Sequence, residues 1–315
     1  MRCSGQWFLT LIISVSSCKL FAQDTTALLS KPDSTLTFSD SLNIFRLIDS
    51  LMNMEEFNST SQLAVRLTYN SNVLWTGRTL GIEQFGLSPG VSYYHKTGLF
   101  ADLSSFWSKD FEPKYYLTIF TGGYMHSFSK RFSLIASYDH YFYNLEDDYI
   151  PYNNAITITP FYDLKPVNFR LDYSFFFGDY SVHRLMPSIG VTLEKRNIFK
   201  LDRISFFPTV FILFGDQTFS EIKFPTTRQE WIAAALRVRQ GLPWYTIETK
   251  RVFGLMNYAV SAPLSIRNNH WNFTASYVFN IPKALPGETL TLENSSFITA
   301  SFTWFFDLSR KKSPL

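Results

Sequence analysis

The sequence predicts an all-β fold, a transmembrane antiparallel up-and-down β-barrel of about 12 strands preceded by a short N-terminal helix. Three observations lead to this prediction. Apolar and polar residues alternate in many successive segments from Gln62 onward. Most of these segments run past ten residues, whereas strands of soluble proteins average about 5–6. No apolar stretch of 18 residues exists beyond the N-terminus, so helical membrane spans are not expected.

The clearest segment is V-N-F-R-L-D-Y-S-F-F-F, residues 167–177. Successive side chains of a strand point to opposite faces. Val167, Phe169 and Leu171 therefore share an apolar face, while Arg170 and Asp172 share a polar one. An apolar face suits hydrocarbon and a polar face suits a barrel interior, and the length matches the ~9–11 residues of a tilted spanning strand.

Residues 1–22 are typical of a secretory signal, with Arg2, a short apolar core and a small residue, Ala22, before the expected cut. Lipoprotein processing at Cys18 is the less favoured alternative. Both cysteines, Cys3 and Cys18, lie in this segment, so the mature chain is expected to have no disulfide, thiolate metal site or cysteine nucleophile. Its formal charge falls from +3 to +1, which offers no electrostatic basis for binding nucleic acid.

Residues 23–60 differ in composition and are expected to be a periplasmic leader with an amphipathic helix over about 41–54, capped by Ser41. This helix would pack against the rim of the barrel, or, less favoured, enter the barrel as a plug. Residues 61–308 form the predicted outer-membrane barrel, and residues 309–315 a basic periplasmic tail.

Twelve strands are expected, approximately at 62–69, 88–95, 99–108, 114–128, 131–144, 154–163, 167–177, 182–195, 201–214, 251–266, 270–281 and 295–308. Pro187 and Pro208 fall inside two of them and predict bulges or local misregister. Short and long connections largely alternate, and short turns face the periplasm in outer-membrane barrels. An even strand number therefore places both termini in the periplasm.

The stretch 215–250 is expected to be irregular and to add no spanning strand or two, so fourteen strands stay open. Within it, 227–240 would be a helix or a strand extension. We weigh two interpretations of Arg228–Arg239: a helix on the outer rim with Trp231 at the membrane interface, which we favour, or a loop that constricts a pore or meets a partner.

Eight charged residues, four of each sign, have the parity of the polar faces and are expected to line the interior: Arg66, Asp102, Asp139, Arg170, Asp172, Arg184, Glu194 and Arg203. The favoured interpretation is an ion-paired network that fills a narrow interior. The alternative is the selectivity lining of a pore.

Catalytic and metal signals are weak. Among the five histidines, only Ser181 and His183 place a serine and a histidine two residues apart on one face at a predicted outer rim. This pair suggests, as the alternative function, a membrane-embedded acyl hydrolase, although no acid partner is evident beyond Asp179 on the same parity. The acidic loop around Glu146 lacks the spacing of a calcium loop. No phosphate-binding or dinucleotide motif appears, so we expect no metal and no cofactor.

Four segments resemble outer-membrane β-barrel proteins of Bacteroidota-type bacteria: the F-A-Q signal end, Gly81–Phe100, Phe253–Leu264 and Ser276–Glu288. The resemblance implies fold and location and brings no substrate or catalytic residues. The expected function is thus an outer-membrane barrel, either a narrow porin-like channel or a structural or interaction barrel. Its expected partners are outer-membrane lipid and a small solute or a protein.

Overall fold

The structure is a computed structural model that describes residues 60–71, 86–109, 113–144, 152–179, 181–286 and 292–308. All of these belong to one compact unit, Asp33–Leu315. The predicted signal, the leader helix, the acidic loop and the basic tail lie outside the described residues.

Fourteen strands form one antiparallel sheet. Their bounds are β1 Gln62–Asn70, β2 Gly86–Tyr94, β3 Leu99–Trp107, β4 Tyr115–Ser127, β5 Phe132–Tyr143, β6 Tyr152–Leu164, β7 Val167–Gly178, β8 Ser181–Val191, β9 Leu193–Ile198, β10 Leu201–Phe206, β11 Thr209–Lys223, β12 Thr246–Asn268, β13 Trp271–Pro282 and β14 Ser295–Asp307.

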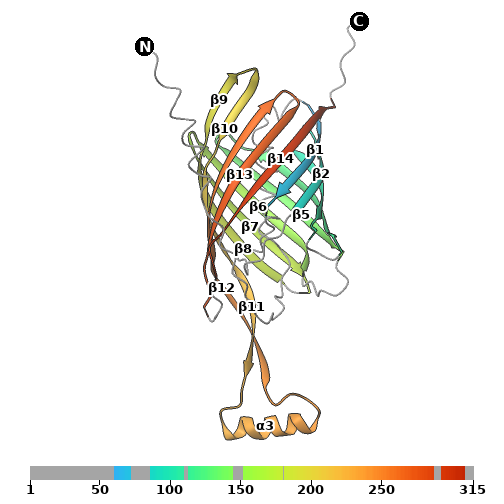
Figure 1. Ribbon diagram of the computed structural model, residues 1–315, viewed down its shortest axis with the longest axis vertical. Helices are drawn as coiled ribbons and strands as arrows, with labels where there is room; N and C mark the ends of the chain where they lie inside the picture. The colour runs from blue at the N-terminus through green and yellow to red at the C-terminus, as the bar shows by residue number, and fades with distance from the viewer. Residues whose placement is uncertain are drawn as a thin grey trace. The chain divides into compact units, whose positions relative to one another are not determined.

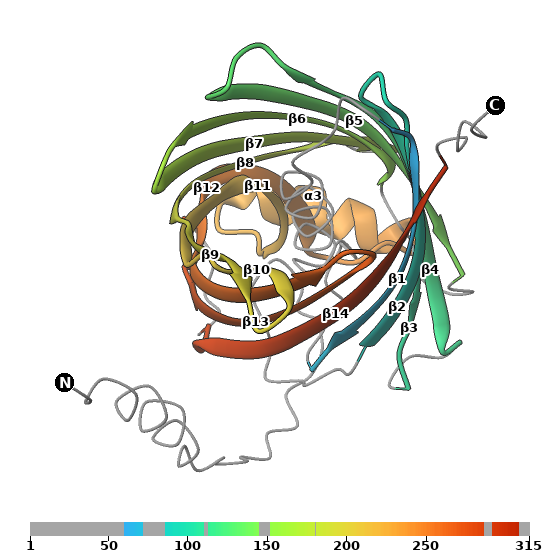
Figure 2. The same cartoon turned by 90° about the horizontal axis from the view of Figure 1, so that it is seen from above.

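The sheet closes into a barrel of twelve strands, with β9 and β10 as two additional short strands. Strands that follow one another in sequence pair from β1 to β8, as the up-and-down prediction requires (Figures 1 and 2). Pairing of β1 with β14, from Gln62 opposite Asp307 to Asn70 opposite Thr299, and of β11 with β8 and β12 completes the ring. Every barrel strand therefore has a neighbour on both sides, which satisfies the backbone without a free edge.

The predicted alternation is confirmed along the wall. On β1, Leu67 is 53% exposed whereas its neighbour Arg66 is 8% exposed. The same difference recurs on other strands, where apolar side chains are exposed on the outside and polar ones are buried inside. Exposed aromatic residues include Phe169, Phe206, Phe273 and Phe302. The outer surface of the barrel is thus apolar and the inner surface largely polar at mid-height.

Two predicted strands are each divided in two. Residues 182–195 form most of β8 and the start of β9, and residues 201–214 form β10 and part of β11. The second break falls at Phe207–Pro208, where proline cannot donate a ladder hydrogen bond. Pro187 remains inside β8 opposite Leu171, with no register shift against β7. The bulge predicted at Pro187 is therefore absent from that pairing.

The stretch 215–250 is more regular than predicted. It contains the end of β11, the helix α3 (Arg228–Arg239) and the start of β12. The pairing of β11 with β8 ends at Gly215, and the pairing of β12 with β13 begins at Asn257. Beyond these points, eight residue pairs, from Asp216–Phe253 to Lys223–Thr246, join β11 and β12 to each other. The hairpin thus leaves the wall as a two-stranded ribbon and carries α3 at its far end (Figure 1).

Within the described residues, no helix is long and apolar enough to span a bilayer. Of the two alternatives expected for residues 227–240, a helix or a strand extension, the structure shows the helix, and a capping box explains where it begins. Thr227 accepts a hydrogen bond from the Glu230 amide, and the Glu230 carboxylate accepts one from the Thr227 amide.

The interior is not polar throughout. Buried apolar side chains form two clusters near the end of the barrel from which the ribbon leaves. One cluster comprises Met186, Phe211, Leu213, Met256, Ala259, Val278, Leu285 and Phe297. The other comprises Phe106, Tyr116, Leu117, Ile119, Tyr141, Tyr152, Ala155 and Phe176. The inner face therefore changes from polar at mid-height to aromatic and aliphatic toward that mouth.

Candidate functional site

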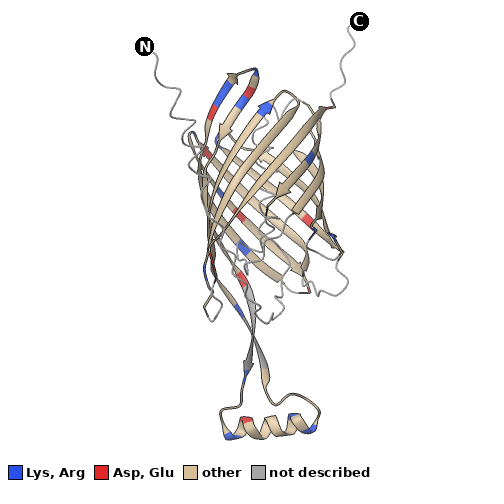
Figure 3. Cartoon of the chain, in the orientation of Figure 1, with Lys and Arg blue, Asp and Glu red and all other residues tan. Residues whose placement is uncertain are grey.

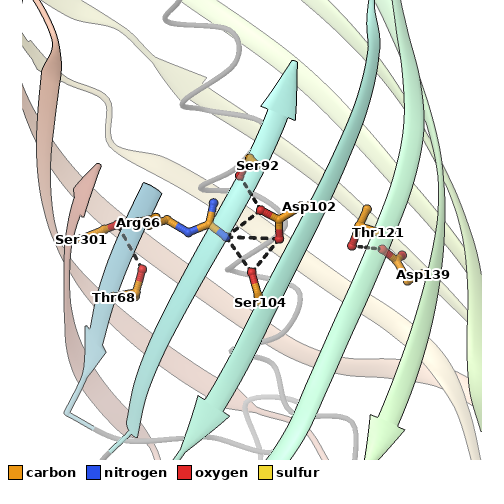
Figure 4. A network of polar contacts seen from close by, with 8 residues as sticks. All are labelled: Arg66, Thr68, Ser92, Asp102, Ser104, Thr121, Asp139 and Ser301. Atoms are coloured by element: carbon orange, nitrogen blue, oxygen red, sulfur yellow. Dashed lines mark hydrogen bonds and ion pairs between the residues drawn. The ribbon is translucent and has the colours of Figure 1, made fainter. Parts of the chain in front are cut away.

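The strongest concentration of buried polar groups lies on the inner face of β1 to β5. We name it the polar belt, and it consists of Arg66, Ser92, Asp102, Ser104, Thr121 and Asp139 (Figure 4). All six side chains are buried. Four of them form one continuous row across the sheet, because Ser92 is opposite Asp102, Asp102 opposite Thr121, and Thr121 opposite Asp139.

Asp102 is the best-satisfied member of the polar belt. Its two carboxylate oxygens accept hydrogen bonds from Ser92 Oγ at 2.5 Å and Ser104 Oγ at 2.6 Å. Arg66 Nη2 lies 3.2 Å from Asp102 Oδ1 and donates to Ser104 Oγ at 2.8 Å. A buried ion pair is favourable only when further hydrogen bonds satisfy its atoms, and the two serines meet that condition here.

A glycine makes this ion pair geometrically possible. Arg66 is on β1 and Asp102 on β3, so the guanidinium must pass over β2. The residue of β2 opposite Arg66 is Gly90. A Cβ atom built at Gly90 would lie 2.9 Å from both Arg66 Nη2 and Ser104 Oγ. The missing side chain therefore provides the space through which Arg66 reaches Asp102.

Asp139 differs from Asp102. Thr121 Oγ1 donates to its Oδ1 at 2.6 Å, while its Oδ2 is buried with no hydrogen-bond partner among the described residues. Within the described part of the chain, no cationic side chain forms an ion pair with it. A buried carboxylate without a counter-charge costs free energy unless water or a solute satisfies it. Asp139 is thus the acidic group of the polar belt whose charge is least compensated by the described residues.

The remaining predicted interior charges lie on β7, β8 and β10. Arg170 Nε lies 3.1 Å from Asp172 Oδ2, and Asp172 also accepts a hydrogen bond from Thr159 at 2.8 Å. Arg184 is buried, with its guanidinium carbon 5.2 Å from the centroid of the Phe176 ring. Arg203 is buried on β10. The structure therefore places seven of the eight predicted charges on the inner face, in several separate groups.

Glu194 is the exception. It lies on β9, whose first five residues are all exposed, and it pairs with Arg196 at 3.1 Å and with Lys165 at 4.0 Å. Strand β9 pairs only with β10, so no second neighbour closes the wall around this position. The alternation in the sequence placed Glu194 on the correct face of its strand, but it did not show that this strand lies outside the closed ring.

One charged pair was missed because its acidic member, Asp216, falls in the stretch predicted to be irregular. Asp216 forms an ion pair with Arg251, and its Oδ2 accepts a hydrogen bond from the His183 backbone amide at 2.9 Å. Asp216 follows Gly215, which makes the last pair of β11 with β8. The carboxylate thus joins the base of the ribbon to the wall. The only sequence signal was the continuation of β11 past Phe214.

The candidate hydrolase pair is not assembled as a catalytic site. Ser181 and His183 have the parity of Ile189, which is exposed on the outer face of β8. The His183 ring lies against Tyr173 and Phe175, with Nδ1 2.8 Å from the Tyr173 hydroxyl. Nothing in this arrangement supports hydrolysis. No group of three residues suited to hold a metal ion is found in the described part of the chain.

Comparison with known proteins gives structural neighbours only. No family model matches the chain, and no curated protein matches it. Similar solved structures include the KdgM porin, with 8% identity, a TM-score of 0.42, and coverage of 76% of this chain and 98% of that one. The NanC porin has 10% identity, a TM-score of 0.40, and coverage of 77% and 98%. Salmonella typhi OmpF, solved with daunomycin, has 9% identity, a TM-score of 0.26, and coverage of 78% and 97%.

Proposed function

We propose that this protein is an outer-membrane β-barrel that forms a narrow, porin-like channel, with both termini in the periplasm. The outer surface supports the membrane location. Side chains such as Val65, Leu67, Ile158 and Phe302 are large, apolar and exposed all around a closed wall. Soluble monomers rarely expose contiguous apolar surface of this kind, and hydrocarbon would cover it.

The observation that carries the channel proposal is the state of Asp139 and Arg184. A barrel that acts only as an anchor or a scaffold would be most stable if every charge in its interior were paired. Here Asp139 Oδ2 and Arg184 Nε are buried polar atoms with no hydrogen-bond partner among the described residues. Water held inside the barrel would satisfy both groups, which supports a hydrated interior such as the lining of a pore.

The architecture also limits the size and charge of the solute. Eight-stranded barrels are filled by side chains and wide channels need about 16–18 strands, so twelve strands fit a narrow bore. The aromatic and aliphatic clusters occupy one end of the interior. In two interior ion pairs, Arg66–Asp102 and Arg170–Asp172, the two charges cancel. We therefore expect slow passage of small polar solutes with weak ion preference.

The test is single-channel recording of the full chain in a planar bilayer. We expect small, discrete conductance steps with a cation-to-anion permeability ratio near one. Fractionation of cells should place the same protein with the outer membrane. Insertion has to be measured independently, by heat-modifiable migration of the folded barrel in gels and by co-flotation with liposomes. A folded, inserted protein that never conducts would overturn the channel and leave a structural or interaction barrel.

A further inference from the structure

We propose that α3 and its flanking residues bind the anionic lipid surface of the leaflet beside which the ribbon leaves the barrel. We name residues 224–245 the helix head. The proposal rests on the membrane-embedded barrel proposed above, and it is independent of whether that barrel conducts. The first argument is that the helix head is built to stay helical without the barrel.

The helix head contains its own stabilising contacts. The Glu230 carboxylate accepts hydrogen bonds from the amides of Thr226 at 2.7 Å and Thr227 at 3.0 Å. The ring of Trp244 stacks on Phe224, with centroids 5.1 Å apart, and on Trp231, with centroids 5.8 Å apart. These contacts join both ends of the hairpin loop to α3. Ala234 is nevertheless the only buried residue of the helix.

The helix head exposes an unusual amount of apolar side chain. Seven large apolar residues are each between 44% and 56% exposed: Phe224, Trp231, Ile232, Leu236, Val238, Leu242 and Trp244. At 100° per residue, Trp231, Ile232, Ala235, Leu236 and Val238 lie on one broad side of α3, and Arg228 and Arg239 lie on the same side as the first and last residues of the helix. This surface faces solvent in the isolated protein, and such exposure commonly marks a binding surface.

The helix head has a net positive charge. Its three arginines, Arg228, Arg237 and Arg239, outnumber its single acidic residue, Glu230, whose carboxylate is occupied by the capping contacts. Figure 3 shows basic residues at both ends of α3. Arginine side chains are long enough to extend from the two ends of this side to anionic headgroups, while the apolar residues between them enter the apolar layer. Its partner should therefore carry negative charge at its surface and an apolar layer beneath it.

These two requirements separate a lipid surface from other occupants. A second copy would bring the same excess of positive charge, which opposes helix-to-helix contact. An acidic glycan would satisfy the arginines and stack on the aromatic rings, but it would leave Ile232, Leu236, Val238 and Leu242 in water. Phosphate-bearing lipid supplies negative headgroups above an apolar layer and so satisfies both.

The ribbon gives the helix head the reach to find such a surface. Eight residue pairs span about 26 Å at 3.3 Å per residue. Beyond Asp216 the ribbon pairs only with itself, and a lone two-stranded ribbon is only marginally stable. The hydrogen bond from the His183 amide to Asp216 Oδ2 connects the base of the ribbon to β8. The ribbon would lean from this base toward the leaflet.

The test uses two single-cysteine labels on opposite sides of α3. Both natural cysteines fall in the predicted signal, so the processed chain is a clean background. Ala235→Cys lies on the apolar side and Ala233→Cys on the other, and both positions are exposed. Each variant carries a polarity-sensitive fluorophore, and the full-length barrel is placed in nanodiscs of phosphatidylglycerol or of phosphatidylcholine.

In phosphatidylglycerol discs we expect the label at position 235 to shift to the blue and to be quenched by brominated acyl chains. The label at position 233 should remain in water. Both signals should weaken in phosphatidylcholine, at 0.5 M salt, or after Arg228→Gln with Arg239→Gln. Barrel folding in each sample is checked by heat-modifiable migration, which separates failure of the barrel from failure of the helix head.

Four results would overturn the proposal. The label at position 235 could stay water-exposed in anionic discs, or both positions could respond equally. It could also become protected in neutral detergent as protein concentration rises, which would identify a second copy as the occupant. Soluble acidic glycan that protects position 235 better than anionic lipid would assign the surface to sugar instead.

Discussion

Arg66 on β1 pairs with Asp102 on β3 across the intervening strand β2, at 3.2 Å between Nη2 and Oδ1. Neither residue contacts the other through a ladder, since their strands are not adjacent. The pair therefore couples three strands through their side chains. Its geometry depends on what β2 places between them, which leads to the first prediction.

Gly90→Val should destabilise the barrel by about 1–3 kcal/mol, the usual cost of overpacking. The new side chain would occupy the space of the Arg66 guanidinium, since even a Cβ would lie 2.9 Å from Nη2. Urea unfolding in liposomes, followed by tryptophan fluorescence, measures the change. Gly122→Val is the matched control, because a Cβ there would meet nothing closer than 3.8 Å. Equal effects at the two glycines would contradict this account.

Arg66→Met should be costly alone and much less so in combination with Asp102→Leu. Removing the cation leaves a buried carboxylate uncompensated, which typically costs about 3–5 kcal/mol, whereas replacing both partners with apolar groups is often near neutral. The same unfolding measurement on both single variants and the double variant gives the coupling free energy. Additive losses would show that the two side chains do not act as a pair.

Asp139→Asn should leave stability unchanged or raise it, in contrast to Asp102→Asn, which should lower it. The amide introduced at position 139 would keep an oxygen for the 2.6 Å hydrogen bond from Thr121 and would remove a charge that has no ion-pair partner among the described residues. Because Asp139 supplies a negative charge to the proposed pore, the same variant should shift the permeability ratio toward anions. Reversal potentials in a salt gradient measure this shift, and an unchanged ratio would place Asp139 outside the conduction path.

The stability of α3 should depend on acidity through Glu230. Hydrogen bonds from the backbone amides of Thr226 and Thr227 lower the pKa of Glu230 to about 2. A carboxyl whose pKa is lower in the folded state stabilises that state above its unfolded pKa, near 4.5, and this stabilisation is lost as the pH falls toward 2. A spin label at Ala233→Cys should become more mobile between pH 5 and pH 2. Glu230→Gln should remove the pH dependence and start from the more mobile state.

The helix head and the turn at Lys96–Gly98 should lie on opposite sides of the membrane. Strand β11 runs from the terminal end of the barrel to the ribbon, and Gln62 and Asp307 meet at that terminal end. In intact cells, a membrane-impermeant maleimide should label Ala233→Cys and spare Lys96→Cys until the outer membrane is opened. The reverse pattern would mean that the termini are outside.

Strand positions and faces were largely predictable because lipid and interior impose a simple rule. An apolar residue such as Leu67 or Phe302 indicates which face of its strand is turned to lipid, and every second residue along the strand then shares that face. The same rule identified seven of the interior charges. It failed at Glu194, because parity says nothing about whether neighbouring strands continue far enough to enclose a residue.

The sequence by itself predicted a closed barrel of about twelve strands with an apolar outer face and a polar inner face, because these features follow from local alternation and from the need of every strand for two partners. Only the tertiary structure decided that Gly90 leaves the space through which Arg66 reaches Asp102, and that β11 and β12 continue into a ribbon bearing α3. It alone also decided that no described cationic side chain forms an ion pair with Asp139. These features depend on the register of neighbouring strands and on how far each strand continues, and alternation within a single strand specifies neither of them.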